Sequence, residues 1–286
     1  MSQAVANQNM TTEPMPMLHT QDGEFPALGF GTWQLNGDTA RSSVAKALDV
    51  GYRHIDTARM YENETEVGRG IADASVARED IFLTTKIFMD SLDAASVKKE
   101  LGDSLESLST DYVDLVLIHW PNPDVPLEET LGALHELRDE GKTRHVGVSN
   151  FPIPWMESAL EASPGPIACN QVEYHPFLSQ APLLEYCRSQ GVPLVAYCPL
   201  AKGGVPDNPF LQEIGRQHGK SAAQVVLRWL LQQPGIGAVP KSKNPEHIRA
   251  NLDVLDFELS DDEMRQIHGL DRGERIINPD WAPDWD

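Results

Sequence analysis

Short apolar runs alternate with helical stretches along most of the chain, and this alternation is its clearest pattern. Eight runs have the length of strands: residues 27–32, 53–56, 81–86, 112–119, 144–150, 168–174, 193–198 and 236–241. Helical stretches lie between them, for example at residues 39–50, 94–108, 127–141 and 221–233. Eight successive strand–helix units in a chain of this length predict a (β/α)8 TIM barrel, an α/β fold with a closed parallel sheet.

A doubly wound open sheet is the alternative arrangement of alternating strands and helices. Such sheets usually carry G-x-G-x-x-G after the first strand. Residues 29–34 read GFGTWQ, which lacks the third glycine and is not followed closely by a helix start. We therefore expect a single barrel domain over residues 16–286, with an N-terminal β-hairpin capping the barrel bottom. Residues 1–15, polar and containing proline, are expected to form a flexible tail.

Composition limits the possible partners. The chain has 286 residues, with 43 Asp and Glu against 23 Lys and Arg, and a net charge of −20. Such a surface repels nucleic acid and anionic membranes, so we expect neither as a partner. No apolar run approaches the roughly 18 residues of a membrane span. The N-terminus has no basic start and no apolar middle, so a secretory signal is not expected.

The three cysteines, Cys169, Cys187 and Cys198, form an odd and sparse set. They favour reduced thiols in the cytoplasm, and no Cys or His spacing resembles a metal site. The acidic balance with few lysines is typical of proteins from salt-loving organisms and predicts salt tolerance, although many ordinary bacterial proteins are equally acidic. Nothing in the sequence demands more than a monomer.

Residues with chemical function stand at the C-terminal ends of all eight predicted strands. They are Thr32-Trp33, Asp56, Lys86, His119, Ser149-Asn150, Gln171, Tyr197 and Lys241. In a (β/α)8 barrel these ends meet on one face, where active sites are built. The pattern therefore predicts one site at the barrel mouth.

Asp56 and Tyr61 stand five residues apart in the segment HIDTARMYENE, and Lys86 and His119 end the next two strands. A Lys86 ammonium about 4 Å from the Tyr61 oxygen would favour the phenolate by about 4 kcal/mol at an effective dielectric near 20. This predicts a Tyr61 pKa lowered by up to about 3, as suits a general acid, with Asp56 keeping Lys86 charged. His119 would orient the substrate oxygen or share the proton. Singly, each residue is more often structural, but together at strand ends they favour catalysis.

Six ordered motifs resemble the aldo-keto reductase family. They are GYRHIDTARMYENETEVG, FLTTKIF, LVLIHWPNP, VGVSNF, NQVEYHP and VPKS, and the match spans residues 24 to about 270. The resemblance implies a NAD(P)H-dependent carbonyl reductase. Its catalytic tetrad would be Asp56, Tyr61, Lys86 and His119, with Tyr61 as the proton donor. The short C-terminal segment is similar to that of bacterial members resembling 2,5-diketo-gluconate reductase.

The resemblance also implies a nicotinamide cofactor. Ser149, Asn150 and Gln171 would hydrogen-bond its carboxamide, and Tyr197 would stack on the nicotinamide ring. Cys198 stands where the family usually has serine. The remaining cofactor positions implied by the resemblance are Thr32, Leu200, Lys202, Lys241, Ser242, Lys243, His247 and Asn251.

The residues expected near the adenosine 2′-phosphate do not all favour the same cofactor, NADPH or NADH. Lys241 and Ser242 match the family's contacts to this phosphate, and Lys243 adds a nearby positive charge. His247 stands where NADPH-preferring members usually carry arginine. An imidazole, mostly neutral near neutral pH, cannot make the bidentate contact that arginine makes. We therefore expect NADPH to be preferred and NADH to be accepted as second choice.

Trp33, Phe88 and Trp120 adjoin the strand ends and would line a substrate pocket. The C-terminal segment would close this pocket near Ile277 and Trp281. Three aromatic side chains suit apolar or flat carbonyl compounds, namely small aldehydes, α-dicarbonyls or keto-sugars. Simple packing of the barrel top is the alternative role for Trp33 and Trp120.

Two other functions remain open from the sequence. Lys86 on a barrel strand could serve a Schiff-base lyase or aldolase, which borohydride trapping would reveal, but a neighbouring Asp56 argues against it by keeping the lysine charged. The chain could also be a non-catalytic nucleotide-binding module. A pure binder, however, has no need for Tyr61 and His119 together.

Overall fold

The computed structural model describes residues 14–286. The flexible tail predicted for residues 1–15 lies almost entirely outside the described residues, so it stays a prediction. Met15 is partly buried and packs against the hydrophobic core.

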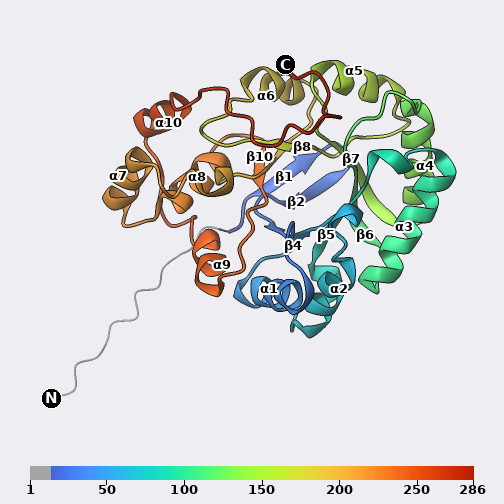
Figure 1. Ribbon diagram of the computed structural model, residues 1–286, viewed down its shortest axis with the longest axis horizontal. Coiled ribbons are helices and arrows are strands. Elements are labelled where there is room, and N and C mark those ends of the chain that lie inside the picture. Colours follow the sequence, from blue (N-terminus) through green and yellow to red (C-terminus); the bar gives the residue numbers. More distant parts are fainter. Residues whose placement is uncertain (1–13) are drawn as a thin grey trace.

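The main sheet has eight parallel strands, paired in sequence order from β3 to β10. Its strands are β3 Phe30–Gly31, β4 His54–Asp56, β5 Phe82–Ile87, β6 Val113–Ile118, β7 Thr143–Ser149, β8 Asn170–Glu173, β9 Leu194–Tyr197 and β10 Ile236–Ala238. A parallel bridge between Leu28 and Ala238 joins the two edges, and Ala238 N donates to Ala27 O at 2.7 Å. The sheet therefore closes on itself, and the predicted (β/α)8 barrel is confirmed (Figure 1).

The first and last barrel strands are shorter than the sequence pattern predicts. The runs 27–32 and 236–241 contain β3 with 2 residues and β10 with 3. A Cβ atom at Gly31 would lie 2.7 Å from the Val239 carbonyl oxygen, so glycine is needed where these two segments approach. Pro240 accepts a hydrogen bond from Gly31 N at 3.0 Å but has no N–H with which to continue the ladder.

Helices connect the strands and cover the outside of the barrel (Figure 1). They are α1 Gly37–Val50, α2 Glu64–Asp73, α3 Ala94–Leu108, α4 Leu127–Asp139, α5 Ile153–Ala162, α6 Ala181–Ser189, α7 Pro209–His218, α8 Ala222–Leu231, α9 Pro245–Leu252 and α10 Asp261–His268. The four helical stretches predicted above correspond to α1, α3, α4 and α8. Helix α8 begins with a capping box between Ser221 and Gln224, and its buried Trp229 packs against Tyr174 after β8.

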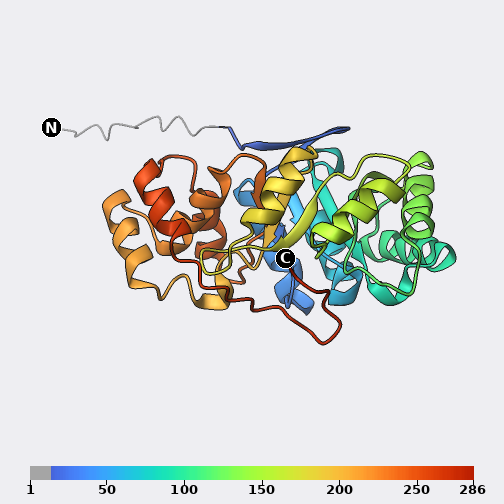
Figure 2. The same ribbon diagram turned by 90° about the horizontal axis from the view of Figure 1, so that it is seen from above.

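An antiparallel hairpin, β1 Met17–Thr20 and β2 Gly23–Pro26, covers the N-terminal ends of the barrel strands. Phe25 is fully buried and stacks on Phe82 at the start of β5, with ring centroids 4.8 Å apart. Asp22, in the hairpin turn, contacts His145 Nδ1 at 3.0 Å. Figure 2 shows the hairpin on one side of the barrel and the C-terminal segment on the other. The predicted cap at the barrel bottom is confirmed, and the opposite face is left for a site.

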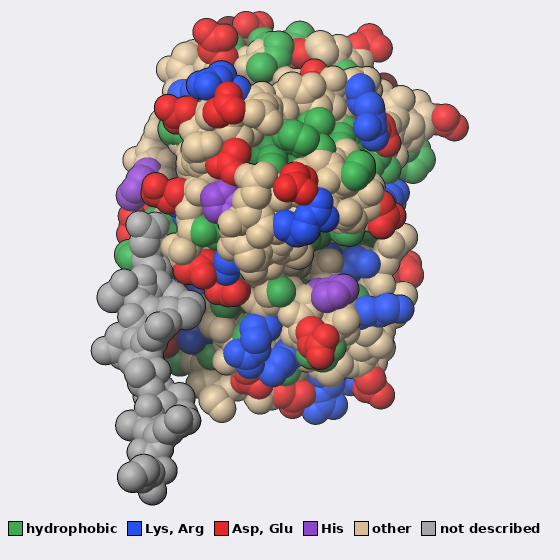
Figure 3. Space-filling model, turned by 90° about the vertical axis from the view of Figure 1, so that its left-hand side faces the viewer, with side chains coloured by type: hydrophobic (Ala, Val, Ile, Leu, Met, Phe, Trp, Pro, Cys, Tyr) green, Lys and Arg blue, Asp and Glu red, His purple; other side chains and the backbone are tan. Residues whose placement is uncertain are grey.

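Charged residues of both signs share the surface despite the net charge of −20. On the face shown in Figure 3, acidic side chains are interspersed with Lys and Arg side chains. Ion pairs such as Lys98–Glu136, at 2.6 Å, join neighbouring helices. Within residues 14–286, no helix is both long and apolar enough to span a bilayer.

Candidate active site

A buried lysine–aspartate pair lies at the C-terminal end of β4 and β5. Asp56 pairs with Thr84 in the ladder, so Lys86, two residues further along β5, points to the same side of the sheet. Lys86 Nζ donates to Asp56 Oδ1 at 2.6 Å, to Thr57 O at 2.8 Å and to Tyr61 Oη at 3.4 Å. These three bonds use all three N–H groups of the ammonium. The structure thus brings Asp56, Tyr61 and Lys86 together as the sequence predicts.

The second carboxylate oxygen of Asp56 joins the pair to the far side of the barrel. Asp56 Oδ2 accepts a hydrogen bond from Gln171 Nε2 at 2.7 Å. The backbone oxygen of Gln171 in turn accepts from Ser149 Oγ at 2.8 Å. Thr32 Oγ1 donates to the Asp56 carbonyl at 3.0 Å. Three residues predicted to contact the cofactor are therefore bonded directly to Asp56 or to one another.

Asn150 connects His119 with Tyr197. Its Nδ2 donates to the His119 carbonyl at 2.9 Å, and its Oδ1 accepts from Tyr197 Oη at 2.7 Å. Asn150 has φ 63°, a left-handed conformation that is uncommon for residues other than glycine. Such strain persists only where the surroundings over-determine it, as they do here. The Tyr197 ring is held in place through its hydroxyl.

Tyr61 ends a short 3-10 helix, Arg59–Tyr61, between β4 and α2. Arg59 holds this turn against the neighbouring helices, with Nε 3.1 Å from Glu100 and Nη1 3.5 Å from Glu64. The chain then turns at Glu62, which has φ 54°. These contacts direct the Tyr61 hydroxyl toward the barrel axis and Lys86.

Asn63 supports the same turn and was missed by the sequence analysis. It is 1% exposed; its Oδ1 accepts from Thr57 Oγ1 at 3.0 Å, and its Nδ2 donates to the carbonyls of Thr32 (2.9 Å) and Leu35 (2.8 Å). From sequence, an asparagine one residue before a helix predicts an N-cap. In the structure the side chain makes no capping bond. It joins the loop after β3 to the loop that carries Tyr61.

The prediction that the Tyr61 pKa is lowered overall is wrong, although Lys86 does act on it in the predicted direction. Burial raises the pKa of Tyr61 above its ordinary value, and the opposing Lys86 charge does not overcome this. The sequence argument counted the lysine charge but could not count the water lost around the phenol. Burial would lower the pKa of Lys86, yet Asp56 and Tyr61 together raise it. Near neutral pH the phenol is thus protonated and the ammonium charged.

His119 faces Tyr61 from the end of β6, with ring centroids 5.8 Å apart. Burial, with the Lys86 charge as a second cause, holds the pKa of His119 well below its ordinary value, so the imidazole is neutral. Its Nδ1 is buried with no hydrogen-bond partner among the described residues. A lone pair without a donor is less costly than a buried N–H without an acceptor, which favours the tautomer protonated on Nε2.

Aromatic side chains surround the mouth above these groups. Phe88 lies edge-on to Trp281 at 6.1 Å, and Trp120 to Trp285 at 6.1 Å. Trp33 is 37% exposed, whereas Trp120 is 5% exposed and largely packed. The structure therefore brings Phe88, Trp120 and the C-terminal Trp281 to one rim, as predicted. Trp285 was missed because nothing in the sequence shows where an irregular terminal segment runs.

The loop after β9 carries Leu200 and Lys202 and has an unusual backbone. Cys198, Ala201 and Lys202 all have positive φ, at 53°, 49° and 47°. The Lys202 ammonium lies over the Trp33 ring, 4.9 Å from its centroid, so this loop contacts the loop after β3. Strained backbone of this kind clusters at ligand-binding segments.

The predicted phosphate residues lie around the start of α9. Lys241, Ser242 and Lys243 precede the helix, and His247 is exposed in its first turn. Asn251 is 5% exposed on the inner side of α9. A helix N-terminus with adjacent cations is a favourable place for an anionic group. Lys241, Lys243 and His247 are exposed, unlike Lys86 and Asp56, whereas Asn251 is buried.

A profile of the Aldo/keto reductase family matches residues 27–272 of the chain. The chain belongs to the aldo/keto reductase family. The glyoxal reductase of Bacillus subtilis is 43% identical over 259 residues, covering 90% of this chain and 93% of the relative. The methylglyoxal reductase DkgB of Escherichia coli O157:H7 is 39% identical over 265 residues, covering 91% and 99%.

Solved aldo/keto reductase structures share the fold. A crystal structure provisionally named 2,5-diketo-D-gluconic acid reductase B has a TM-score of 0.91 and 45% identity, covering 94% of this chain and 98% of that chain. The Bombyx mori aldo-keto reductase in complex with NADP has a TM-score of 0.86 and 34% identity, covering 92% and 95%.

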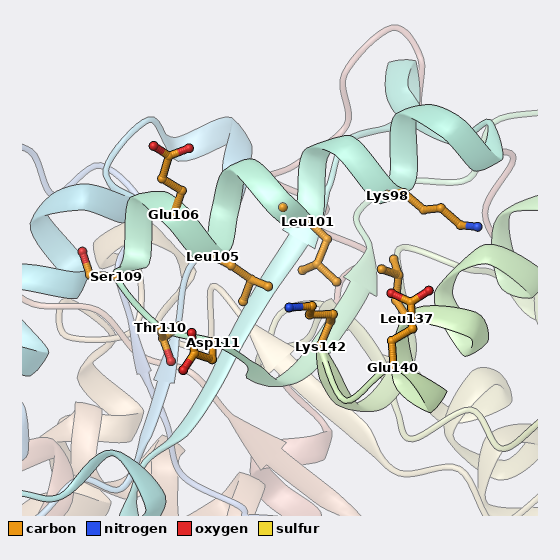
Figure 4. A pocket seen from close by; sticks show the side chains of 11 residues that line it. Lys98, Leu101, Leu105, Glu106, Ser109, Thr110, Asp111, Leu137, Glu140 and Lys142 are labelled. Carbon is orange, nitrogen blue, oxygen red and sulfur yellow. The ribbon is translucent and has the colours of Figure 1, made fainter.

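Two cavities of this aldo/keto reductase lie outside the tetrad. A groove of about 600 Å³ between α3 and α4 is lined by Leu101 and Leu105, with Lys142 at its centre (Figure 4), and it contains none of the predicted site residues. A second cavity, of about 670 Å³, is lined by Met60 and Phe88 among others and so adjoins the mouth. Within residues 14–286, no group of three His, Cys, Asp or Glu side chains is placed to hold a metal ion.

Proposed function

We propose that the protein reduces aldehydes or ketones to alcohols with a nicotinamide cofactor, NADPH in preference to NADH. The favoured substrates are α-dicarbonyls such as glyoxal and methylglyoxal, with small aldehydes and keto-sugars beside them. Relatives named glyoxal and methylglyoxal reductases support this class, and the Bombyx relative was solved with NADP. The bound cofactor would supply a hydride from nicotinamide C4 to the carbonyl carbon.

The observation that carries the proposal is the buried ammonium of Lys86. Its charge lies 3.4 Å from the Tyr61 oxygen, the atom that would lose a proton to the developing alkoxide. A fixed charge in a site shielded from water stabilises the phenolate as it forms, without reorganisation. The raised pKa of Tyr61 keeps the donor protonated until the substrate oxygen becomes basic.

His119 would orient the substrate. With the proton on Nε2, the neutral imidazole would donate a hydrogen bond to the carbonyl oxygen. Its depressed pKa, caused first by burial, means that it does not compete with Tyr61 as the acid. Tyr61 then gives the proton, and His119 directs the oxygen that receives it.

The polar wall formed by Ser149, Asn150 and Gln171 would bind the nicotinamide carboxamide. Asn150 and Gln171 are 1% and 2% exposed, and both already have bonded side chains, so the wall is rigid before the cofactor arrives. Tyr197 would offer its ring face, held by the bond to Asn150. Rigid surroundings place the hydride donor with little loss of entropy on binding.

The opposite end of the cofactor would lie against Lys241, Ser242 and Lys243 near the start of α9. These residues favour a 2′-phosphate, and therefore NADPH. His247 gives a weaker contact than the arginine that the family usually has there. NADH is accordingly accepted as second choice.

The Schiff-base alternative has no support from the geometry. All three N–H groups of Lys86 are bonded, and Asp56 and Tyr61 raise its pKa even though burial lowers it. A nucleophilic lysine must instead be a free, neutral amine.

The test is NADPH oxidation with purified protein across glyoxal, methylglyoxal, simple aldehydes and 2,5-diketo-gluconate. We expect turnover with several of these, and the highest kcat/KM with an α-dicarbonyl. NADPH binding without oxidation by any carbonyl would overturn the proposal and leave a nucleotide-binding module. Borohydride trapping of a substrate on Lys86 would overturn it in favour of a lyase.

A further inference from the structure

Glu173 ends β8 and has no part in the chemistry described above. Its side chain is completely buried, and its carboxylate accepts three hydrogen bonds. His175 Nε2 donates to Oε1 at 2.9 Å, Ile276 N donates to Oε1 at 2.8 Å, and Ile277 N donates to Oε2 at 2.7 Å. Two of the three donors belong to the backbone of the C-terminal segment, about a hundred residues further along the chain.

These hydrogen bonds explain how an ionised carboxylate can be stable in a fully buried position. Burial alone would raise the pKa of Glu173, but the bonds from His175, Ile276 and Ile277 hold it below its ordinary value. Hydrogen bonds to an ionised acceptor are roughly twice as strong as neutral ones. The start of the terminal segment is therefore bound to the barrel through one buried charge.

The terminal segment, residues 276–286, then crosses the mouth of the barrel (Figure 2). It contains no helix or strand. Trp281 contacts Phe88, which follows β5, and Trp285 contacts Trp120, which lies just beyond the neighbouring strand β6. At its end, the Asp286 carboxylate accepts from Ile153 N at 3.0 and 3.1 Å, at the start of α5. The segment has one buried attachment, at Glu173, and one exposed attachment, at Asp286.

We propose that Glu173 is a positioning residue for substrate binding, acting through residues 276–286. By holding Ile276 and Ile277 it sets where Trp281 and Trp285 stand, and those side chains form the outer wall of the substrate pocket. This inference rests on the proposed carbonyl reduction for its readout. It assigns Glu173 no contact with the substrate or the nicotinamide.

The first test replaces Glu173 by glutamine, which keeps the shape but turns an N–H group toward one of the backbone donors. Losing bonds to a buried charge corresponds to about a tenfold or larger change in an equilibrium. We expect KM for methylglyoxal to rise by about tenfold, while kcat and the affinity for NADPH change little. Glu274→Gln is the matched control, because this exposed carboxylate lies two residues before the segment and pairs with Arg272, and it should leave KM unchanged.

The second test is a double-mutant cycle with Trp281→Ala, which separates action through the segment from a general role in the barrel. If Glu173 acts through the segment, Glu173→Gln should add little to the KM of Trp281→Ala. Additive effects, or a loss of kcat and NADPH affinity with KM unchanged, would overturn the inference.

If Glu173→Gln does not fold, Ile277→Pro is the second variant, because it removes the backbone N–H that donates to Glu173. An unchanged KM in Ile277→Pro would overturn the inference equally. A wild-type protein that reduces no carbonyl refutes the proposed function, whereas an active wild type with a normal KM in Glu173→Gln refutes only this inference.

Discussion

Two lysine–aspartate pairs in this protein have the same length and different surroundings. Lys86 and Asp56 lie 2.6 Å apart at the barrel mouth, with side chains 1% and 4% exposed. Lys99 and Asp103 also lie 2.6 Å apart, on the outer face of α3, with side chains 69% and 34% exposed. A list of ion pairs by distance would rank them equally.

The surroundings decide what each pair can do. At the mouth, little water competes with the pair, so the charge of Lys86 acts on Tyr61 at full strength and its loss leaves Asp56 buried without its cation. On α3, water and salt screen the pair, and exposed pairs of this kind contribute little. The same contrast separates the largely buried tetrad from the exposed residues at the start of α9. Substitutions in the tetrad are therefore expected to change activity strongly and independently of salt. Substitutions at the start of α9 are expected to have small effects that depend on salt.

The largest effect is expected for Tyr61→Phe. Loss of a general acid typically lowers the rate by about 100- to 10,000-fold, so kcat for methylglyoxal reduction should fall within that range. The fold and NADPH binding should persist, because within residues 14–286 the Tyr61 hydroxyl makes only the 3.4 Å bond to Lys86. Stopped-flow turnover and quenching of protein fluorescence by NADPH measure the two properties. Near-normal turnover by a well-folded variant would remove Tyr61 from the mechanism.

Lys86→Met tests the comparison directly, with Lys99→Met as its matched control. Breaking a buried pair from one side destabilises by about 3 to 5 kcal/mol, so Lys86→Met should lower the unfolding free energy and abolish turnover. Lys99→Met should leave both unchanged. Urea unfolding and steady-state kinetics of the two variants are the measurements. Similar losses of stability and turnover in the two variants would mean that burial does not determine how much a lysine–aspartate pair contributes.

The pH profile of reduction follows from the three shifted groups at the mouth. His119 has a lowered pKa and stays neutral, whereas Tyr61 and Lys86 have raised pKa values and stay protonated. The rate should therefore be flat between about pH 6 and 8 and should fall at alkaline pH, as Tyr61 loses the proton that it must donate. The residual rate of Tyr61→Phe should lack this alkaline decline. An acidic limb near neutrality would show that His119 titrates there.

A smaller effect is expected at the exposed end, from His247→Arg. An exposed pair contributes about 0.2 to 1 kcal/mol, which corresponds to about a 1.4- to 5-fold increase in the preference for NADPH. The ratio of kcat/KM for NADPH to that for NADH measures it. His19→Arg, an exposed histidine of the hairpin at the other end of the barrel, is the control. An unchanged ratio in the His247 variant would mean that this residue does not face the phosphate.

The smallest effect is expected from salt, because the tetrad that sets kcat is largely buried. At about 1 M NaCl the Debye length is about 3 Å, so repulsion among the acidic groups on the surface is screened. The melting temperature and kcat should hold or rise, while the preference for NADPH decreases. Sucrose at matched osmolality controls for solvent effects that are unrelated to charge. A steep loss of kcat below about 1 M, with no gain in melting temperature, would favour ordinary acidity over salt tolerance.

Much of the fold could be predicted because each strand–helix unit is encoded locally. The eight apolar runs gave the strands and their order, and the shared direction of parallel strands placed Asp56, Lys86 and Gln171 on one face. Strand length at the closure was not predictable. The short β3 results from the close approach of Gly31 to Val239, a contact between distant parts of the chain.

The sequence predicted which residues form the candidate site, but it did not predict their pKa values. The pKa of Tyr61 depends on how much water the folded chain removes, which no local pattern encodes. Asn63 and Glu173 were missed for a related reason. Their partners are backbone groups of distant segments, Thr32 and Leu35 for one and Ile276 and Ile277 for the other, and backbone groups leave no signal in a sequence.

The bridge between Leu28 and Ala238 has a consequence for biosynthesis. The ring cannot close until β10 has left the ribosome, and pairing between such distant segments is slow because loop closure must come first. Until then the edge of β3 has unpaired N–H and C=O groups, which can pair with another chain. The nascent protein is therefore most prone to aggregate just before its synthesis ends. A chaperone that shields this edge during translation should raise the yield of soluble enzyme more than one that acts on the finished barrel.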